Sequence, residues 1–222
     1  MTAPIVTVDD SIAKVWDGLC LGCITYSVEI QPKNQELWDY YESSLATSLQ
    51  QKLSVTDLAQ MPQIGEARAA FKAFGIDPGR YRISSEALYR RIRQGKPLYQ
   101  INSLVDANNV LSLQTGFSLG SYDASCIGSN IVFRLGVSGE SYAGIGKAEI
   151  ALENVPVLAD GTGPFGSPIS DSTRGMITPK TKEALTVIYS FSGRAALDDA
   201  LQLTKRLFAE AAFATGIRAC SL

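Results

Sequence analysis

The chain has 222 residues, of which 45% are hydrophobic, and a formal net charge of −2 at pH 7. That length and apolar content are enough for a sizeable core, but the charge gives no global positive field, so contact with nucleic acid must rest on a local basic patch. The absence of histidine excludes the Ser-His nucleophile pair, the commonest general base near neutral pH and the commonest zinc ligand.

Two features bear on the cell compartment. No apolar run approaches the roughly 18 residues that span a bilayer, and the first ten residues lack the order of a signal peptide, so we expect a cytoplasmic protein that does not enter a membrane. Of the four cysteines, Cys20 and Cys23 lie in a strand-like stretch without a second Cys-x-x-Cys pair, which favours buried thiols over a metal or redox pair. No metal or other cofactor is predicted.

The first half of the chain predicts strands followed by helices. Residues 5–30 are rich in β-branched and alternating apolar residues, which indicates a strand region. From Pro32 onward an apolar residue recurs at every fourth position, which predicts a helix of about five turns. Three shorter helices are predicted over Pro62–Phe74, over 85–94 with Ser84 or Ser85 as its cap, and over Asn102–Gln114 before Gly116.

The second half changes to short β-branched segments separated by Gly, Asn and Pro. Residues 131–137, 141–150 and 154–160 predict antiparallel strands, whereas 161–179 predict an irregular functional or mobile loop. A buried strand is expected over 183–191 and a terminal helix over 196–215. Because helices surround a strand-rich half without β-α-β alternation or a linker, the sequence predicts an α+β fold with mixed or antiparallel sheets, forming one module over 1–222.

Two blocks, 80–123 and 159–181, carry motifs at fixed spacing. The first block contains Ser-Ser-Glu-Ala-Leu at Ser84–Leu88, Asn-x-Leu-Val-Asp at Asn102–Asp106 and Asn-x-x-Ser-Leu at Asn109–Leu113. With the Gly- and Ser-rich second block, these motifs resemble the tRNA-binding and editing module, domains B3 and B4, of the phenylalanyl-tRNA synthetase beta subunit. The resemblance implies that module's fold and a function at the aminoacylated end of tRNA, without the signatures of an aminoacylation core.

The resemblance also implies a site, with two departures. The family's Thr-Asn pair at the edge of the editing pocket falls on Asn108 and Asn109, and its histidine falls on Gly120, which has no side chain. The glutamate that reads the hydroxyl of mischarged tyrosine has no acidic counterpart within Val187–Ser190. Because a site that loses its hydrogen-bonding partner loses discrimination, specificity for tyrosine is not expected.

A different set of groups is predicted to act instead. Backbone N–H groups of the glycine-rich loop, together with Ser167 and Arg174, provide donors that stabilise an oxyanion. We expect Gly166, Ser170 and Asp171 to border a pocket that faces Asn108 and Asn109, where a positioned water attacks the labile aminoacyl ester. The predicted catalytic residues are Asn109, Ser170 and Asp171, and the predicted substrate-binding residues are Asn108, Asn109, Gly120, Gly166, Ser167 and Arg174.

The site residues also have structural interpretations. Asn108 and Asn109 either contact substrate or tie a helix to nearby backbone, and Asp171 is either a ligand or a turn-forming residue. A basic cluster interleaved with tyrosines is predicted to bind RNA, or else to compensate the dipole of a helix C-terminus. The cluster consists of Arg80, Arg82, Arg90, Arg91, Arg93 and Lys96, and the predicted RNA-binding residues are Arg82, Arg90, Arg91 and Arg93.

The predicted function is therefore binding of an aminoacyl-tRNA or of the tRNA acceptor end, with hydrolytic editing of mischarged tRNA in trans as the candidate activity. The alternative is a non-catalytic module that binds a free amino acid, a similar small metabolite or another protein. The loss of the histidine and of the acid favours the alternative, whereas the retained Asn pair and the Gly- and Ser-rich loop favour the first function.

Overall fold

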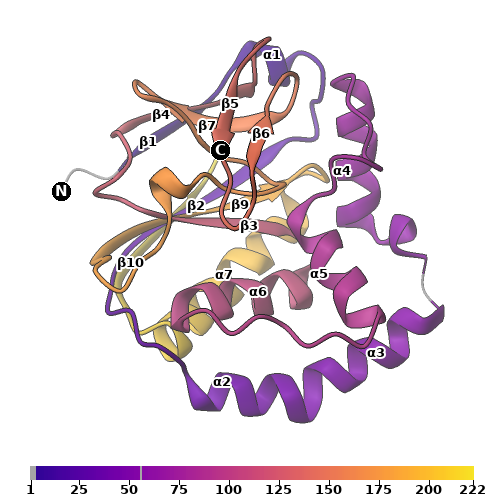
Figure 1. Ribbon diagram of the computed structural model, residues 1–222, viewed down its shortest axis with the longest axis vertical. Coiled ribbons are helices and arrows are strands. Elements are labelled where there is room, and N and C mark those ends of the chain that lie inside the picture. The colour runs from indigo at the N-terminus through magenta and orange to yellow at the C-terminus, as the bar shows by residue number, and fades with distance from the viewer. Residues whose placement is uncertain (1–3, 56) are drawn as a thin grey trace.

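The computed structural model describes residues 4–55 and 57–222, and most of its strands lie in two four-stranded sheets (Figure 1). Sheet A has the order β1-β4-β7-β8, formed by Ile5–Val8, Asn130–Leu135, Pro156–Asp160 and Gly163–Gly166. Sheet B has the order β10-β2-β9-β3, formed by Ala214–Ser221, Cys20–Val28, Glu183–Ser190 and Ser118–Asp123. A separate ribbon pairs β5 (Ser141–Ala143) with β6 (Glu149–Ala151).

Strand directions confirm the predicted α+β class with mixed and antiparallel sheets. All neighbours in sheet B run antiparallel, whereas in sheet A β1 runs parallel to β4 and the other pairs are antiparallel. The helices are α1 (Asp10–Ala13), α2 (Gln35–Tyr40), α3 (Ala46–Val55), α4 (Pro62–Ala73), α5 (Ser84–Arg93), α6 (Ser103–Thr115) and α7 (Ala195–Ala211). A π-helical stretch, Tyr41–Leu45, joins α2 to α3, so the predicted long helix is continuous.

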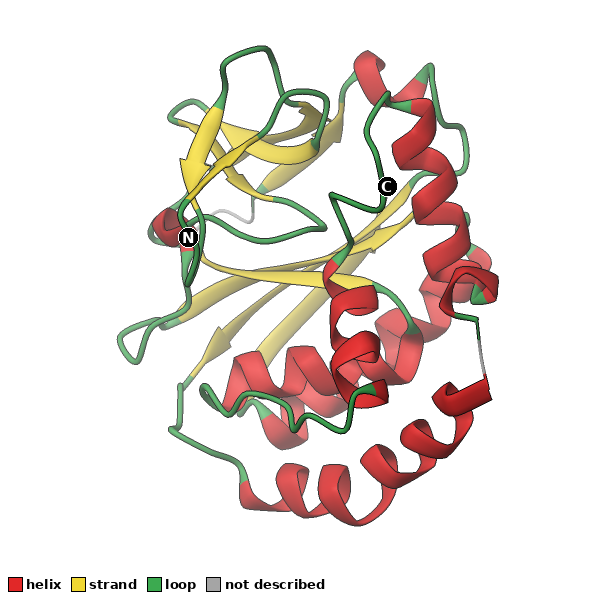
Figure 2. Ribbon diagram, turned by 45° about the vertical axis from the view of Figure 1, so that its right-hand side comes forward, coloured by secondary structure: helices red, strands yellow, loops and turns green. Residues whose placement is uncertain are grey.

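Sheet B is the middle layer of the molecule. Its side chains alternate between two faces, and Gly22 marks the face toward α7, because a Cβ there would lie 2.9 Å from a methyl carbon of Leu201. Helices α5, α6 and α7 gather on this outer face (Figure 2). On the opposite, inner face the ring of Tyr189 lies 5.5 Å from the ring of Phe133 in β4. The inner face of sheet B therefore packs against sheet A.

Three strands were not predicted from the sequence. β3 follows α6 directly, and β8 lies within the predicted irregular loop. The predicted terminal helix over 196–215 was too long, because α7 ends at Ala211, and Phe213 adopts a left-handed φ of 57° before β10 begins. Pairing with β2 outweighs the apolar spacing that made 212–215 resemble a continuing helix.

The start of α5 also differs from its prediction. Its N-cap residue is Ile83, and neither serine forms a side-chain cap. Instead, the backbone N–H of Ser84 donates to the Pro168 carbonyl at 2.8 Å, and the N–H of Ser85 donates to Ser118 Oγ at 3.2 Å. The first turn of α5 is therefore held by the loop after β8 and by β3. None of the described helices combines the length and apolarity needed to cross a bilayer.

Candidate functional site

A hydrogen-bonded cluster lies between the two sheets around Tyr122 of β3. The Tyr122 hydroxyl donates to Asp171 Oδ1 at 2.8 Å and lies 2.7 Å from the hydroxyl of Tyr189 in β9. The backbone N–H of Ser167 donates to the same Asp171 oxygen at 3.2 Å. We call Tyr122, Ser167, Asp171 and Tyr189 the tyrosine–aspartate cluster. It joins sheet B to the loop that follows β8.

Gly120 and Gly166 make room for the Tyr122 ring. A Cβ at Gly120 would lie 2.0 Å from the Tyr122 hydroxyl oxygen, and a Cβ at Gly166 would lie 2.3 Å from it. The tyrosine thus fills the space beside Gly120, where the resemblance places a histidine. In this structure both predicted substrate-binding glycines contact a buried side chain of the protein itself.

Asp171 has the electrostatics of a group that titrates near neutral pH. Burial raises its pKa to about 7, although the hydrogen bonds from Tyr122 and from the Ser167 N–H oppose the rise. Both of these hydrogen bonds end on Oδ1. Oδ2 has no hydrogen-bond partner among the described residues. Asp171 therefore has one anchored oxygen and one oxygen without a protein partner.

The other polar residues of this loop hold its shape. Ser167 Oγ donates to the Ser170 carbonyl at 2.9 Å and accepts a hydrogen bond from the Tyr142 hydroxyl at 3.1 Å. Arg174, predicted to contact substrate, binds both carboxylate oxygens of Asp160 at 2.9 and 3.0 Å. The Asp160 side chain is 1% exposed, so this ion pair clamps the β7–β8 hairpin.

Asn108 and Asn109 lie apart from the tyrosine–aspartate cluster. Asn108 donates to the Leu119 carbonyl and accepts from Ser121 Oγ, both at 3.3 Å. Ser121 and Tyr122 are neighbours in β3, so their side chains project from opposite faces of sheet B. The prediction of one pocket between these asparagines and Asp171 is therefore wrong, because sheet B separates the two groups. Asn109 is half-buried, and its side chain has no hydrogen-bond partner among the described residues.

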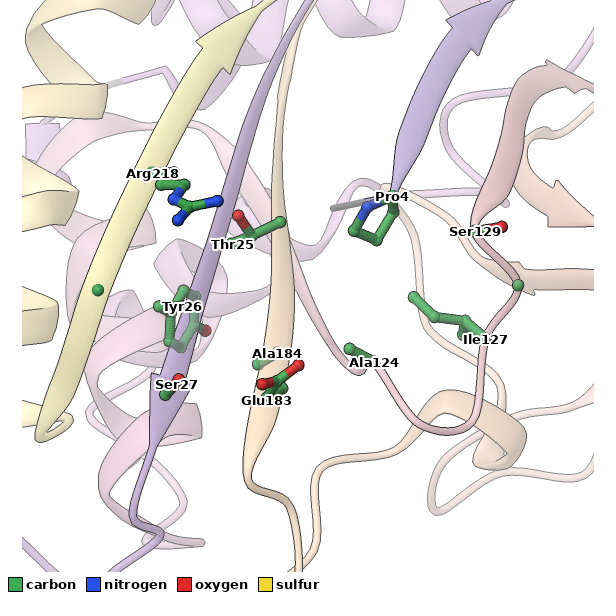
Figure 3. A pocket seen from close by; sticks show the side chains of 12 residues that line it. Pro4, Thr25, Tyr26, Ser27, Ala124, Ile127, Ser129, Glu183, Ala184 and Arg218 are labelled. Carbon is green, nitrogen blue, oxygen red and sulfur yellow. The ribbon is translucent and has the colours of Figure 1, made fainter. Parts of the chain in front are cut away.

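A pocket of about 380 Å³ opens between the sheets, and none of the four residues of the tyrosine–aspartate cluster lines it. Glu183 at its edge lies two residues along β9 from Leu185, the register partner of Tyr122, and roughly 20 Å along the strand from Tyr189. Figure 3 shows the lining: β2, β9 and β10 supply one wall, and the segment before β4 supplies the other with Pro4. We call it the inter-sheet pocket, and its lining residues are Pro4, Thr25, Tyr26, Ser27, Ala124, Ile127, Gly128, Ser129, Glu183, Ala184, Gly216 and Arg218.

The polar side chains of the inter-sheet pocket share one face of sheet B. Ser27 is the register partner of Glu183, and Thr25 is the register partner of Arg218. Because these residues alternate in phase along their strands, all four side chains project from the inner face. These four residues bring one carboxylate, one guanidinium and two hydroxyls to the pocket, and Ser129 lines the opposite wall. Sequence analysis did not find the pocket, because no strand was predicted over 214–221.

The arginines predicted to bind RNA are spread over the length of α5 and the segment before it. Arg82 precedes α5 and Arg93 ends it, so about 15 Å of helix lies between them. Both are exposed, and their side chains have no ion pair or hydrogen bond with other described residues. Arg90 instead pairs at 2.8 Å with Glu86, whose side chain is 1% exposed. Arg90 therefore helps to hold the helix, although part of its side chain remains in solvent.

Arg91 has an aromatic partner. Its guanidinium lies 3.8 Å from the centroid of the Tyr99 ring and donates to the Tyr99 hydroxyl at 2.9 Å. The Tyr99 side chain remains exposed beside it. This stack presents a cation and a ring together, as nucleic-acid surfaces do, but it also orders the segment after α5 by itself.

Comparisons with known proteins agree with the predicted resemblance. Residues 66–220 match the family model of the B3/4 domain. A solved N-terminal fragment of the phenylalanyl-tRNA synthetase beta subunit from Pyrococcus horikoshii is 16% identical, with a TM-score of 0.49 over 99% of this chain and 50% of that chain. The chain thus spans half the length of that fragment, and none of the curated proteins matches it. Since the family model covers well over half of the sequence, the chain belongs to the B3/4 domain family.

Proposed function

We propose that the chain binds the aminoacylated end of a tRNA and takes the aminoacyl group into the inter-sheet pocket. Membership of the B3/4 family supports this function, as does the resemblance to a tRNA-binding and editing module. The observation that carries the proposal is the pair of opposite charges, Glu183 and Arg218, on one face of the pocket.

The two charges suit the groups of an aminoacyl ester. The ester keeps the ammonium of its amino acid, for which the Glu183 carboxylate is a charge-assisted acceptor. The terminal nucleotide brings a phosphate, for which the Arg218 guanidinium is the matching donor. A volume of about 380 Å³ lies at the small end of ligand pockets, which fits an aminoacyl group better than a whole nucleotide.

A binding experiment tests this assignment. We expect tighter binding of aminoacyl-tRNA than of uncharged tRNA, and Glu183→Gln should weaken the aminoacyl-tRNA complex about tenfold. Glu210→Gln, an exposed change on α7, is the matched control and should leave affinity unchanged. Free amino acids form a third arm, because a protein that binds them and ignores tRNA would be the small-molecule module instead. Equal affinity for charged and uncharged tRNA would contradict the proposal.

Ester hydrolysis in trans is the second candidate function. It is favoured by Asp171, whose pKa burial raises to about 7 and whose Oδ2 has no hydrogen-bond partner among the described residues, as a general base that activates water requires. Asn109 does not share this site, since sheet B lies between the Asn108–Asn109 side and Asp171.

Deacylation of a mischarged tRNA panel separates the two functions. If Asp171 is the base, Asp171→Asn should abolish deacylation and Asn109→Ala should preserve it. Loss of turnover in Asn109→Ala with normal turnover in Asp171→Asn would sink this second candidate. Absence of any turnover alongside selective binding of aminoacyl-tRNA would leave the binding function alone.

A further inference from the structure

Cys23 of β2 and Cys220 of β10 stand directly opposite each other in sheet B. Along the same strands Leu21 and Leu222 exchange both backbone hydrogen bonds, at 3.1 and 3.0 Å. Such pairs recur at every second residue, so Cys23 and Cys220 also form a hydrogen-bonded pair, with Cα atoms about 5.5 Å apart. Disulfides usually join Cα atoms roughly 4.4–6.8 Å apart, which includes this separation.

The two thiols share a face of the sheet. Residues directly opposite each other in an antiparallel pair project to the same side, whereas Cys20, three residues from Cys23 on the same strand, projects to the other. Cys126 lies outside the sheet, in the turn between β3 and β4. All four cysteines are free thiols. Cys23 and Cys220 are therefore the pair whose positions suit a cross-link.

The environments of the Cys23 and Cys220 thiols differ, and this difference determines which of the two reacts first. Cys220 is exposed on the edge strand of sheet B, where an oxidant reaches it. Cys23 is 5% exposed, and burial raises its pKa to about 12, which keeps it protonated. The accessible thiol reacts first, and the buried thiol then meets the oxidised sulfur within the same sheet.

We propose that Cys23 and Cys220 form a reversible cross-strand disulfide when the protein meets hydrogen peroxide. The Cys220 sulfur attacks one peroxide oxygen, so an S–O bond forms and the O–O bond breaks, and the hydroxide released combines with the proton that the Cys220 thiol gives up to make water. The Cys23 sulfur then attacks the Cys220 sulfur, so the S–S bond forms and the S–O bond of the sulfenic acid breaks, and the hydroxide that leaves takes the Cys23 thiol proton to make a second water. Two thiols are oxidised while one peroxide is reduced to two waters.

The cross-link would restrain one wall of the inter-sheet pocket. Arg218 lies two residues before Cys220, and Thr25 lies two residues after Cys23, all on the inner face. Between Thr215 and Arg218 the register of β10 shifts, and Gly216 has a φ of 61°. The disulfide would fix β10 to β2 just beyond this irregular stretch. The modification itself does not depend on which ligand the pocket binds.

Peroxide treatment of the full chain tests the proposal. Mass spectrometry under non-reducing conditions should show a loss of two hydrogen atoms per chain and a linked peptide pair containing Cys23 and Cys220. Dithiothreitol should restore the starting mass, and the oxidised chain should melt at a higher temperature. Cys220→Ser, an exposed substitution, should abolish the cross-link, whereas Cys126→Ser should preserve it.

Two results would overturn the assignment. One is a Cys220 sulfinic acid beside a free Cys23 after peroxide treatment. The other is a disulfide that survives in Cys220→Ser or is lost in Cys126→Ser. Melting curves of the reduced variants establish that each is folded before oxidation is compared.

Discussion

At the scale of single residues, Tyr122 determines which side chains meet on the inner face of sheet B. Its ring lies over Gly120 and Gly166, and its hydroxyl joins Asp171 to Tyr189. The family position expected to carry histidine is a glycine here because the neighbouring phenol needs that space. The chain has thus replaced a titratable ring with a buried tyrosine bonded to a titratable carboxyl.

Gly120→Ala and Gly166→Ala should each destabilise the protein. The added Cβ would lie 2.0 or 2.3 Å from the Tyr122 hydroxyl oxygen, so the buried ring has to move, at a cost of about 1–3 kcal/mol in free energy of unfolding. Urea denaturation measures this cost. Gly161→Ala is the control, because a Cβ there meets no atom within 4 Å. Equal stability of all three variants would show that Tyr122 is not held as described.

The carboxyl of Asp171 predicts a pH dependence of stability. Its pKa is about 7 when folded, above the value of roughly 3.9 for an unfolded chain, so the stability associated with its protonated form is fully present below about pH 4 and is lost as pH rises through 7. The free energy of unfolding of Asp171→Asn relative to wild type should therefore rise across this range. Asp199→Asn, at an exposed position, is the comparison, and a pH-independent difference for Asp171→Asn would contradict the assignment.

At the scale of elements, one buried carboxylate of α5 joins this helix to α4. Glu86 accepts from Arg90 on its own helix at 2.8 Å and from Arg68 of α4 at 3.2 Å. Because the Glu86 side chain is 1% exposed, it depends on these partners for the solvation that water would provide. The pairing thus joins α4 to the helix whose first turn touches the loop after β8.

Glu86→Gln should weaken this junction. We expect a loss of about 1–3 kcal/mol in free energy of unfolding, below the value for a fully buried pair because both arginines remain partly in solvent. Faster hydrogen exchange in α4 and α5 should accompany it. Glu66→Gln, on the exposed side of α4, should change neither quantity. Exchange that rises equally in both variants would argue against a special role for Glu86.

The helices were easier to predict from sequence than the sheets. Leu37, Leu49 and Leu53 are buried at helical spacing, and Gly116 has a left-handed φ of 84° after α6, as its position suggested. β10 was missed because its partner, β2, lies almost 200 residues earlier in the chain, and local spacing carries no record of that pairing.

The errors in the predicted site arose because the same two strands, β3 and β10, were not predicted. Without β3, nothing in the sequence showed that Ser121 and Tyr122 face opposite layers, so Asn108 and Asp171 were expected to meet. Without β10, Arg218 had no place beside Thr25, and the inter-sheet pocket was invisible. The predicted roles of individual residues in catalysis and in RNA binding remain predictions.

At the scale of the whole molecule, charge limits how a polyanion is held. The net charge is −2, Arg90 and Arg174 are engaged in ion pairs with partly or fully buried carboxylates, and Arg82 and Arg93 lie at opposite ends of α5. The proposed complex therefore relies on the aminoacyl group rather than on a long backbone contact.

The salt dependence of tRNA binding measures this limit. For a contact with one to three phosphates, log K should fall with log salt concentration with a slope of about −0.7 to −2. Arg218→Gln should make the slope shallower by about 0.7 if that arginine binds a phosphate. A slope steeper than about −4 would indicate a broad basic surface and would contradict the model of a short contact.

The position of β2 in sheet B constrains the order in which the fold can form while the chain is being synthesised on the ribosome. β2 is complete by Val28, yet both of its neighbours in the sheet, β9 and β10, are synthesised only from Glu183 onward. The helices over 35–115 are synthesised before β9 and β10, so sheet B is not yet there for them to cover. During this time both edges of β2 remain unpaired. Sheet A can form earlier, because its last strand, β8, ends at Gly166, whereas sheet B, and with it the layered structure, is completed only after β10 has been synthesised.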